Sequence, residues 1–171
     1  MRRPICSLLS ALLLATAGAG AAEPAPVQSA VVRLAPDFSI PGTSGKPRTL
    51  RSLRGQSVVL LIAKNPKVGA LKKQVRYLQE LFEQFASKGT IFAVALREGD
   101  ASQVRTNVPL ASVYDGPAVA DAYGVKKNFA IAIIGLDGNI DYQTEKVVPP
   151  ERVRDVVQNS FPIQASLRKK Q

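Results

Sequence analysis

Histidine and tryptophan are absent from this sequence of 171 residues, which has one cysteine (Cys6) and one methionine (Met1). One cysteine cannot form a disulfide within the chain. Zinc, copper, haem and iron–sulfur sites lack their usual ligands, and a histidine-based triad or proton shuttle is excluded. We therefore expect neither a metal nor another cofactor.

The first 22 residues have the pattern of a secretory signal peptide. Arg2 and Arg3 precede an apolar run over residues 5–17, and the small residues at 19–22 fit a signal-peptidase cleavage site. The run is too short to span a bilayer comfortably. We predict that cleavage removes both sulfur-containing residues and leaves no transmembrane anchor. The protein would then be exported, to the periplasm or the extracellular space; an uncleaved anchor is the alternative.

Basic residues outnumber acidic ones, with 23 Lys and Arg against 13 Asp and Glu, and the formal net charge is +10. This excess favours anionic partners, such as an acidic protein, an acidic polymer or a membrane surface. The basic residues are scattered along the chain, so we expect no nucleic-acid binding.

The hydrophobic pattern predicts strands that alternate with helices. Continuous apolar runs at 58–63 and 90–96 are typical of central strands that are buried on both faces. Between them, apolar residues at three- and four-residue spacing predict an amphipathic helix over 66–88. Asn65 is its expected N-cap, and Pro66 its first residue.

The other expected elements are shorter. They are a β-hairpin and one helical turn over 35–55, a strand at 108–114, a short helix at 117–123, a β-hairpin at 131–142 around Asp137-Gly138, and a helix at 150–160. This order predicts an α/β domain in which helices cover both faces of a mixed sheet.

Two segments carry a family resemblance. The first is Ala35-Pro36-Asp37-Phe38, which continues through Leu53-Arg54-Gly55 into the strand at 58–62. The second runs from Tyr123-Gly124-Val125 to Asp137-Gly138. Together they resemble the thioredoxin-like redoxin superfamily, of the alkyl hydroperoxide reductase and thiol-specific antioxidant type. The resemblance covers most of residues 34–160 and implies a thioredoxin-like α/β fold, with a central mixed β-sheet flanked by helices.

The resemblance places the family's reactive cysteines at the N-terminus of the long helix. Backbone N–H groups and the helix dipole lower the pKa of a thiol there. In this sequence the two cysteine positions fall at Val68 and Leu71, and the cis-proline of the substrate loop falls at Phe129. A peroxiredoxin's single cysteine would lie in the same loop. The resemblance therefore indicates a member without its catalytic residues.

Lysines surround the same region. Lys64 and Lys67 lie at the expected helix start, and Lys126, Lys127 and Asn128 lie in the loop that would face it. Ammonium groups around a helix N-terminus could bind an anion. Alternatively, these are solvated lysines on two loops with no shared ligand.

We predict four segments: a signal peptide at 1–22, a linker at 23–30, a thioredoxin-like domain at 31–162 and a basic tail at 163–171. The predicted function is a non-catalytic binding or interaction module for an anionic ligand or an envelope protein. The alternative, implied by the resemblance, is a thiol-disulfide oxidoreductase or a peroxiredoxin-type antioxidant protein.

Overall fold

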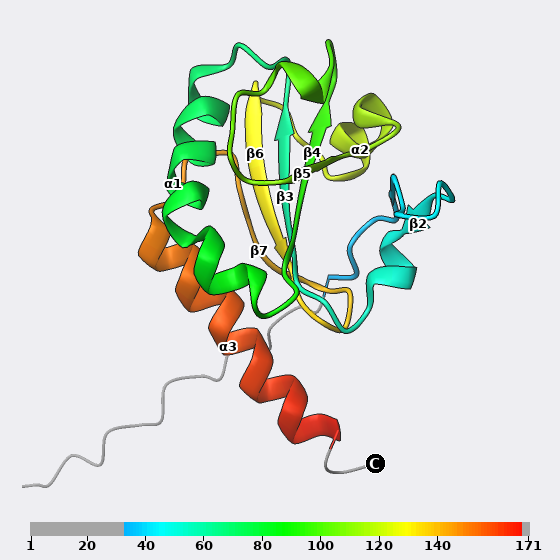
Figure 1. The fold of residues 1–171 in the computed structure, drawn as a ribbon, viewed down its shortest axis with the longest axis vertical. Coiled ribbons are helices and arrows are strands. Elements are labelled where there is room, and N and C mark those ends of the chain that lie inside the picture. Colours follow the sequence, from blue (N-terminus) through cyan, green and yellow to red (C-terminus); the bar gives the residue numbers. More distant parts are fainter. Residues whose placement is uncertain (1–32, 169–171) are drawn as a thin grey trace, which may run out of the picture. The chain divides into compact units, whose positions relative to one another are not determined.

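The computed structural model of this protein describes residues 33–168, with side chains up to residue 159. A five-stranded sheet with the order β5-β4-β3-β6-β7 lies at its centre (Figure 1). Its strands are β3 (Val58–Ala63), β4 (Ile91–Leu96), β5 (Leu110–Ser112), β6 (Phe129–Ile134) and β7 (Ile140–Thr144). β4 pairs in parallel with β3 and β5, whereas β6 pairs antiparallel with β3 and β7. The expected mixed sheet is confirmed.

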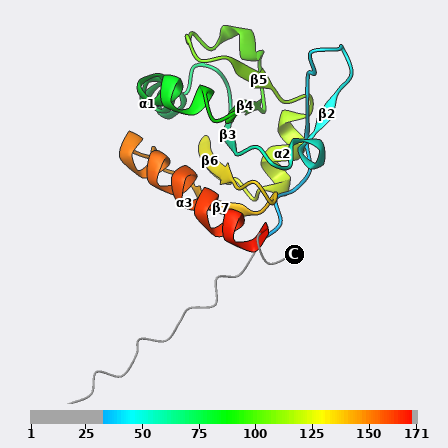
Figure 2. The ribbon, with the colours of Figure 1, turned by 60° about the horizontal axis from the view of Figure 1, so that its bottom comes forward.

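Helices cover both faces of this sheet, because the side chains of its central strands alternate between two cores. Helices α1 (Gly69–Ala86) and α3 (Pro150–Arg168) lie on one face, where they pack on Val59 and Leu61. Helix α2 (Gly116–Ala122) lies on the other face, over Leu60 and Ile62. Figure 2 shows the two layers on either side of the strands. The architecture is the expected thioredoxin-like α/β fold.

Smaller elements complete the domain. The expected N-terminal hairpin is present as β1 (Ser39–Ile40) and β2 (Arg48–Thr49), and the 3-10 helix η1 (Leu50–Leu53) follows it. A second 3-10 helix, η2 (Ala101–Gln103), lies between β4 and β5. The expected turn between β6 and β7 contains Gly138, whose φ of 83° is a conformation that glycine adopts readily.

The start of α1 differs from the sequence prediction, since the helix begins at Gly69 and not at Pro66. The side chain of Asn65 does act as a hydrogen-bond acceptor, but it accepts from the amide of Lys67 at 3.0 Å. This local bond stabilises a turn that precedes the helix. Val68 is therefore the N-cap, without a side-chain capping bond.

Two other boundaries also differ. The expected strand at 108–114 is reduced to β5, since the Val108 amide bonds the hydroxyl of Thr106 at 2.9 Å and Pro109 has no N–H to donate. Helix α3 continues to Arg168, beyond the expected end at residue 160 and into the predicted basic tail at 163–171.

The predicted signal peptide at 1–22, the linker at 23–30 and residues 169–171 lie outside the described residues. Within the described part of the chain, no helix combines the length and apolar character that crossing a bilayer requires.

Candidate functional site

Aliphatic side chains occupy the N-terminus of α1, where the resemblance places the reactive cysteines. Val68 is the N-cap residue, with φ −57° and ψ 123°, and its carbonyl accepts the Lys72 amide at 3.2 Å. Leu71, in the first turn, is completely buried. Neither side chain can donate, accept or act as a nucleophile. The backbone here is thus a helix N-terminus that follows a central strand, with aliphatic side chains at Val68 and Leu71.

Phe129, at the predicted cis-proline position, lies beside this helix start. It is the first residue of β6 and pairs with Ala63, the last residue of β3. Its side chain is buried in the apolar cluster that also contains Leu71, and Val68 packs against that cluster. All peptide bonds between described residues are trans. The three predicted positions therefore belong to one apolar cluster, in which Leu71 and Phe129 are buried and against which Val68 packs.

The facing loop contains Lys126, Lys127 and Asn128, and the structure brings it against Lys64. The Lys64 amide donates to the Asn128 carbonyl at 2.9 Å. The carboxylate of Glu145, just beyond β7, accepts the amides of Lys126 at 2.7 Å and of Lys127 at 3.0 Å. The hydrogen bonds from the amides of Lys127 and Lys126 hold the pKa of Glu145 below its usual value, because they stabilise the carboxylate.

Carboxylates of the chain itself therefore neutralise part of the predicted lysine cluster. The Lys127 ammonium lies 3.7 Å from Glu145, and the Lys64 ammonium lies 3.9 Å from Glu98. Sequence reasoning missed both carboxylates. The only available signal was the β6–β7 hairpin, which returns the chain from Lys127 to Glu145. An external anion in this loop would compete with the Glu145 carboxylate for the same N–H groups.

Lys67 does not join the other four predicted residues in these contacts. Its side chain lines a pocket of about 420 Å³ on another side of α1, together with Lys72, Arg76 and Arg105. The predicted anion site is therefore divided between two places, and the second of them includes three basic residues that sequence reasoning did not single out.

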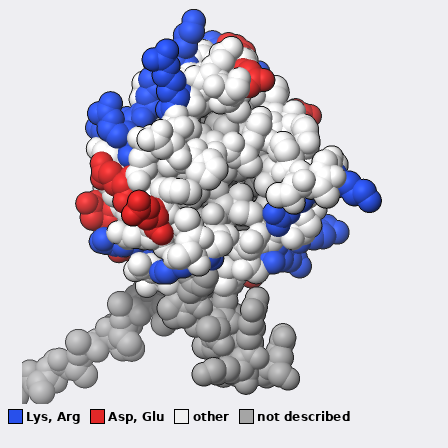
Figure 3. Space-filling model, in the orientation of Figure 1, with Lys and Arg blue, Asp and Glu red and all other residues white. Residues whose placement is uncertain are grey.

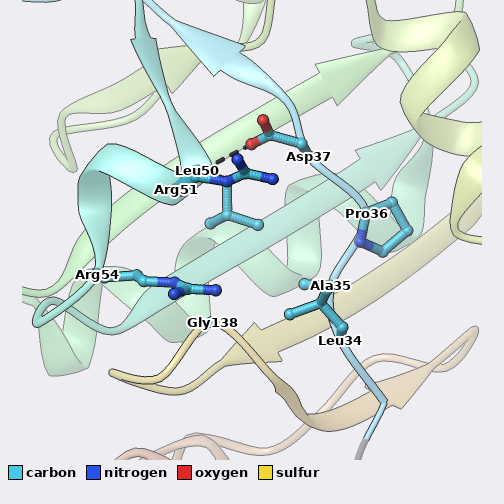
Figure 4. A pocket seen from close by; sticks show the side chains of 8 residues that line it. All are labelled: Leu34, Ala35, Pro36, Asp37, Leu50, Arg51, Arg54 and Gly138. Carbon is cyan, nitrogen blue, oxygen red and sulfur yellow. Dashed lines mark hydrogen bonds between the residues drawn. The ribbon is translucent and has the colours of Figure 1, made fainter.

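Another pocket, of about 280 Å³, lies between η1 and the segment that precedes β1 (Figure 4). The Asp37 carboxylate accepts the Arg51 amide at 3.4 Å and the Phe38 amide at 3.1 Å. Arg54 extends across the pocket toward the Gly138 turn (Figure 4). The hydrogen bonds of Asp37 hold its own segment against η1, and this explains its position without a ligand.

Acidic side chains elsewhere in the described residues do not assemble into a metal site, because no three Asp, Glu, Cys or His residues there are grouped to hold an ion. The carboxylate of Asp137, in the β6–β7 turn, makes its hydrogen bonds within the turn itself. Asp137 accepts the amide of Asn139 at 2.9 Å and also bonds its side-chain amide at 2.6 Å.

A central strand, the helix that follows it and the antiparallel β6–β7 hairpin define a thioredoxin-fold protein, and solved structures share this fold. A thiol:disulfide interchange protein of the thioredoxin family from Chlorobium tepidum has a TM-score of 0.62 at 15% identity, covering 75% of this chain and 96% of its own. A peroxidoxin from Mycobacterium tuberculosis has a TM-score of 0.55 at 19% identity, covering 77% and 96%. The exposed lipoprotein thioredoxin of Streptococcus pneumoniae has a TM-score of 0.56 at 15% identity, covering 72% and 99%.

The sequence itself identifies the family. The AhpC/TSA family model matches residues 31–143, more than half of the chain, and the chain belongs to that family. A comparison with curated proteins gave no match.

Proposed function

We propose that this protein is an exported redoxin-fold module that binds an anionic ligand or an envelope protein and catalyses neither thiol-disulfide exchange nor peroxide reduction. One observation carries the proposal: the helix N-terminus that would activate a cysteine presents Val68 and the buried Leu71. Both reactions require a thiolate that attacks a disulfide or a peroxide. The only cysteine, Cys6, lies in the predicted signal peptide.

No other side chain at this position supplies an equivalent nucleophile. Residues 64–71 contain no Ser, Thr, Tyr or carboxylate, and no histidine exists in the chain to activate a hydroxyl. The two lysines of this segment, Lys64 and Lys67, are solvent-exposed, whereas a nucleophilic lysine is one desolvated in an apolar pocket or placed beside another cation. A binding role needs none of these groups.

Export is part of the same proposal. Its support is the basic, apolar and small-residue order of residues 1–22, which matches a signal peptide. A fold of the same class in an exposed lipoprotein thioredoxin is consistent with a location outside the cytoplasm.

Activity assays test the non-catalytic proposal directly. The purified protein is expected to reduce insulin disulfides, and to consume hydrogen peroxide in the presence of dithiothreitol, at the rate of the buffer blank. A thioredoxin and a peroxiredoxin assayed in parallel provide the positive controls. A rate clearly above the blank that persists in Cys6→Ser would overturn the proposal.

A cysteine introduced at the helix start tests whether only the sulfur is missing. In a Cys6→Ser background, Val68→Cys is expected to have a thiol pKa at least about one unit below the ordinary 8.5 or so, because the helix N-terminus stabilises the thiolate. Ser87→Cys, at the C-cap of the same helix, is the matched control, and its thiol pKa should be at or above the ordinary value. The pH dependence of iodoacetamide alkylation measures both. Equal pKa values would show that this helix start has no activating field.

A further inference from the structure

Basic side chains without acidic partners line the pocket of about 420 Å³ beside α1. Lys72 and Arg76 come from one side of the helix, Lys67 comes from the turn before it, and Arg105 comes from the segment after η2. No Asp or Glu is among the lining residues. Four cations from three separate segments thus converge on one hollow in the surface.

These four cations differ in their surroundings from the basic residues that form ion pairs in the described structure. Ion pairs among the described residues involve Lys64, Arg97, Lys127 and Arg154, and none involves a cation of this pocket. Within the described part of the chain, none of these four cations is therefore held in an ion pair.

The charge order along α1 opposes the stability of the helix. Lys72, Lys73 and Arg76 lie in its first half and Glu80 and Glu83 in its second, with no acidic residue in the first turn and no basic residue in the last. In Figure 3, which has the orientation of Figure 1, blue side chains gather at the upper left of the face shown and red ones lie below them. The helix dipole favours the opposite order.

The repulsion is increased by spacing, because Lys72 and Arg76 lie four residues apart on one helical face. Both unfavourable effects are relieved when an anion lies between these side chains. The arrangement costs stability in the free protein and favours a bound anion, as expected for a binding surface rather than a solvated helix face.

We propose that this pocket binds a compact polyanion with three or four negative charges, made of phosphate or carboxylate groups. Guanidinium groups such as those of Arg76 and Arg105 can each bind an oxyanion through two N–H donors. The side-chain amides of Gln79 and Gln103 add neutral hydrogen-bonding groups to the pocket. The buried residues Val75 and Val104 form an apolar part of its wall. A volume of about 420 Å³ is in the range of small-molecule sites.

This inference deepens the proposed function, on which it rests only for the assumption that binding is the protein's role. It assigns the ligand to the side of α1, and not to the loop of Lys126 and Lys127, where Glu145 already occupies the N–H groups.

Calorimetric titration of the purified protein with tripolyphosphate, and separately with citrate, tests the proposal at about 0.15 M salt, where weak surface attraction is screened. Saturable binding of one equivalent of either probe is expected. The triple variant Lys72→Gln, Arg76→Gln, Arg105→Gln should weaken it about 1,000-fold, since each of the three charged contacts accounts for about tenfold. A comparison of the two probes shows whether phosphate or carboxylate groups are preferred.

The matched control removes the same number and kind of charges from outside the pocket, in the triple variant Lys46→Gln, Arg51→Gln, Arg54→Gln. All three residues are exposed and lie in the β1–β2 turn or around η1, whose buried residues belong to the other core from α1, and none of them lines the pocket. This control should change the affinity less than about threefold, as expected for distant screened charges. Equal losses in both variants, or no binding by the unmodified protein, would overturn the proposal.

Stability and activity separate the possible failures. Removing Lys72 and Arg76 relieves helix repulsion, so the pocket variant should melt at the same temperature as the unmodified protein or higher, and loss of binding then cannot reflect unfolding. Insulin or peroxide turnover would contradict the non-catalytic proposal but leave the titration result intact. Absent polyanion binding would overturn the pocket assignment alone.

Discussion

Replacing Gly116 with alanine is expected to destabilise the fold by about 3 kcal/mol or more, at the upper end of what overpacking costs. A Cβ atom on Gly116 would overlap the Leu96 carbonyl oxygen, and would lie 2.6 Å from its carbonyl carbon and 2.7 Å from its amide nitrogen. These are backbone atoms of β4, so no side chain can rotate to make room. Helix α2 would have to move away from the strand that it covers.

Gly69→Ala is the matched control for this prediction. Gly69 is the first residue of α1, and a Cβ atom there meets no atom within 4 Å. Because alanine restricts the unfolded chain more than glycine does, this change should be neutral or stabilise the fold by up to about 1 kcal/mol. Urea unfolding of both variants measures the difference. A loss below about 1 kcal/mol for Gly116→Ala would show that α2 moves on β4 at little cost.

Gly116 also illustrates why the fold was more predictable than its internal contacts. The apolar runs at 58–63 and 90–96 predicted the two central strands correctly, because a strand buried on both faces has to be continuously apolar. The start of α1 was predicted three residues early. The pair Asn65-Pro66 is equally typical of a helix N-cap and of a turn that precedes a helix, so the sequence alone does not distinguish them. Only the Lys67 amide, bound to the Asn65 side chain, distinguishes the two cases.

For the candidate site, the motif spacing chose Val68, Leu71 and Phe129, and the structure places all three in or against one apolar cluster. The distribution of charge was not predictable, because it depends on pairs distant in sequence. Glu145 meets Lys127 across the β6–β7 hairpin, and Arg105 reaches the pocket beside α1 from an irregular segment whose path has no periodic signal.

The two lysine-containing places have different physical consequences. Around Lys126 and Lys127, a carboxylate of the chain already satisfies the N–H groups, so this loop is stabilised without a ligand. Beside α1, the cations repel one another along the helix and have no described ion-pair partner. Positive charge contributes to stability in the loop of Lys126 and Lys127, and it opposes stability in the pocket beside α1.

Gln74 is the other residue whose substitution should have a large effect. It interrupts the apolar stripe of α1 three residues after Leu71, and its side chain is completely buried. Its amide nitrogen donates to the Val148 carbonyl at 3.0 Å, and its oxygen accepts the Val148 amide at 2.7 Å. One side chain thus satisfies both backbone groups of the buried residue that precedes α3.

Gln74→Leu is expected to lower the free energy of unfolding by about 2–5 kcal/mol. The leucine has a similar volume but cannot form the hydrogen bond that Gln74 makes to the N–H of Val148 or the one that it makes to the carbonyl. Each buried group left unsatisfied costs about 1–3 kcal/mol. Urea unfolding at pH 7 measures the loss. A change below about 1 kcal/mol would mean that the segment around Val148 moves until water satisfies both groups.

Gln74→Glu distinguishes lost hydrogen bonds from altered packing. The protonated carboxyl can accept the Val148 amide and donate to its carbonyl, as the glutamine does, whereas the carboxylate would be a buried charge facing a carbonyl oxygen. Burial raises the pKa of this carboxyl in the folded state above its unfolded value of about 4.3. A group with a raised folded pKa loses its contribution as the pH rises. The free energy of unfolding of this variant should therefore approach that of the unmodified protein near pH 4 and fall about 3–5 kcal/mol below it by pH 8.

Gln84→Glu, at an exposed position of the same helix, is the control, and its free energy of unfolding should not diverge from that of the unmodified protein in this way. A pH-independent deficit in Gln74→Glu would assign the role of Gln74 to packing and not to its hydrogen bonds.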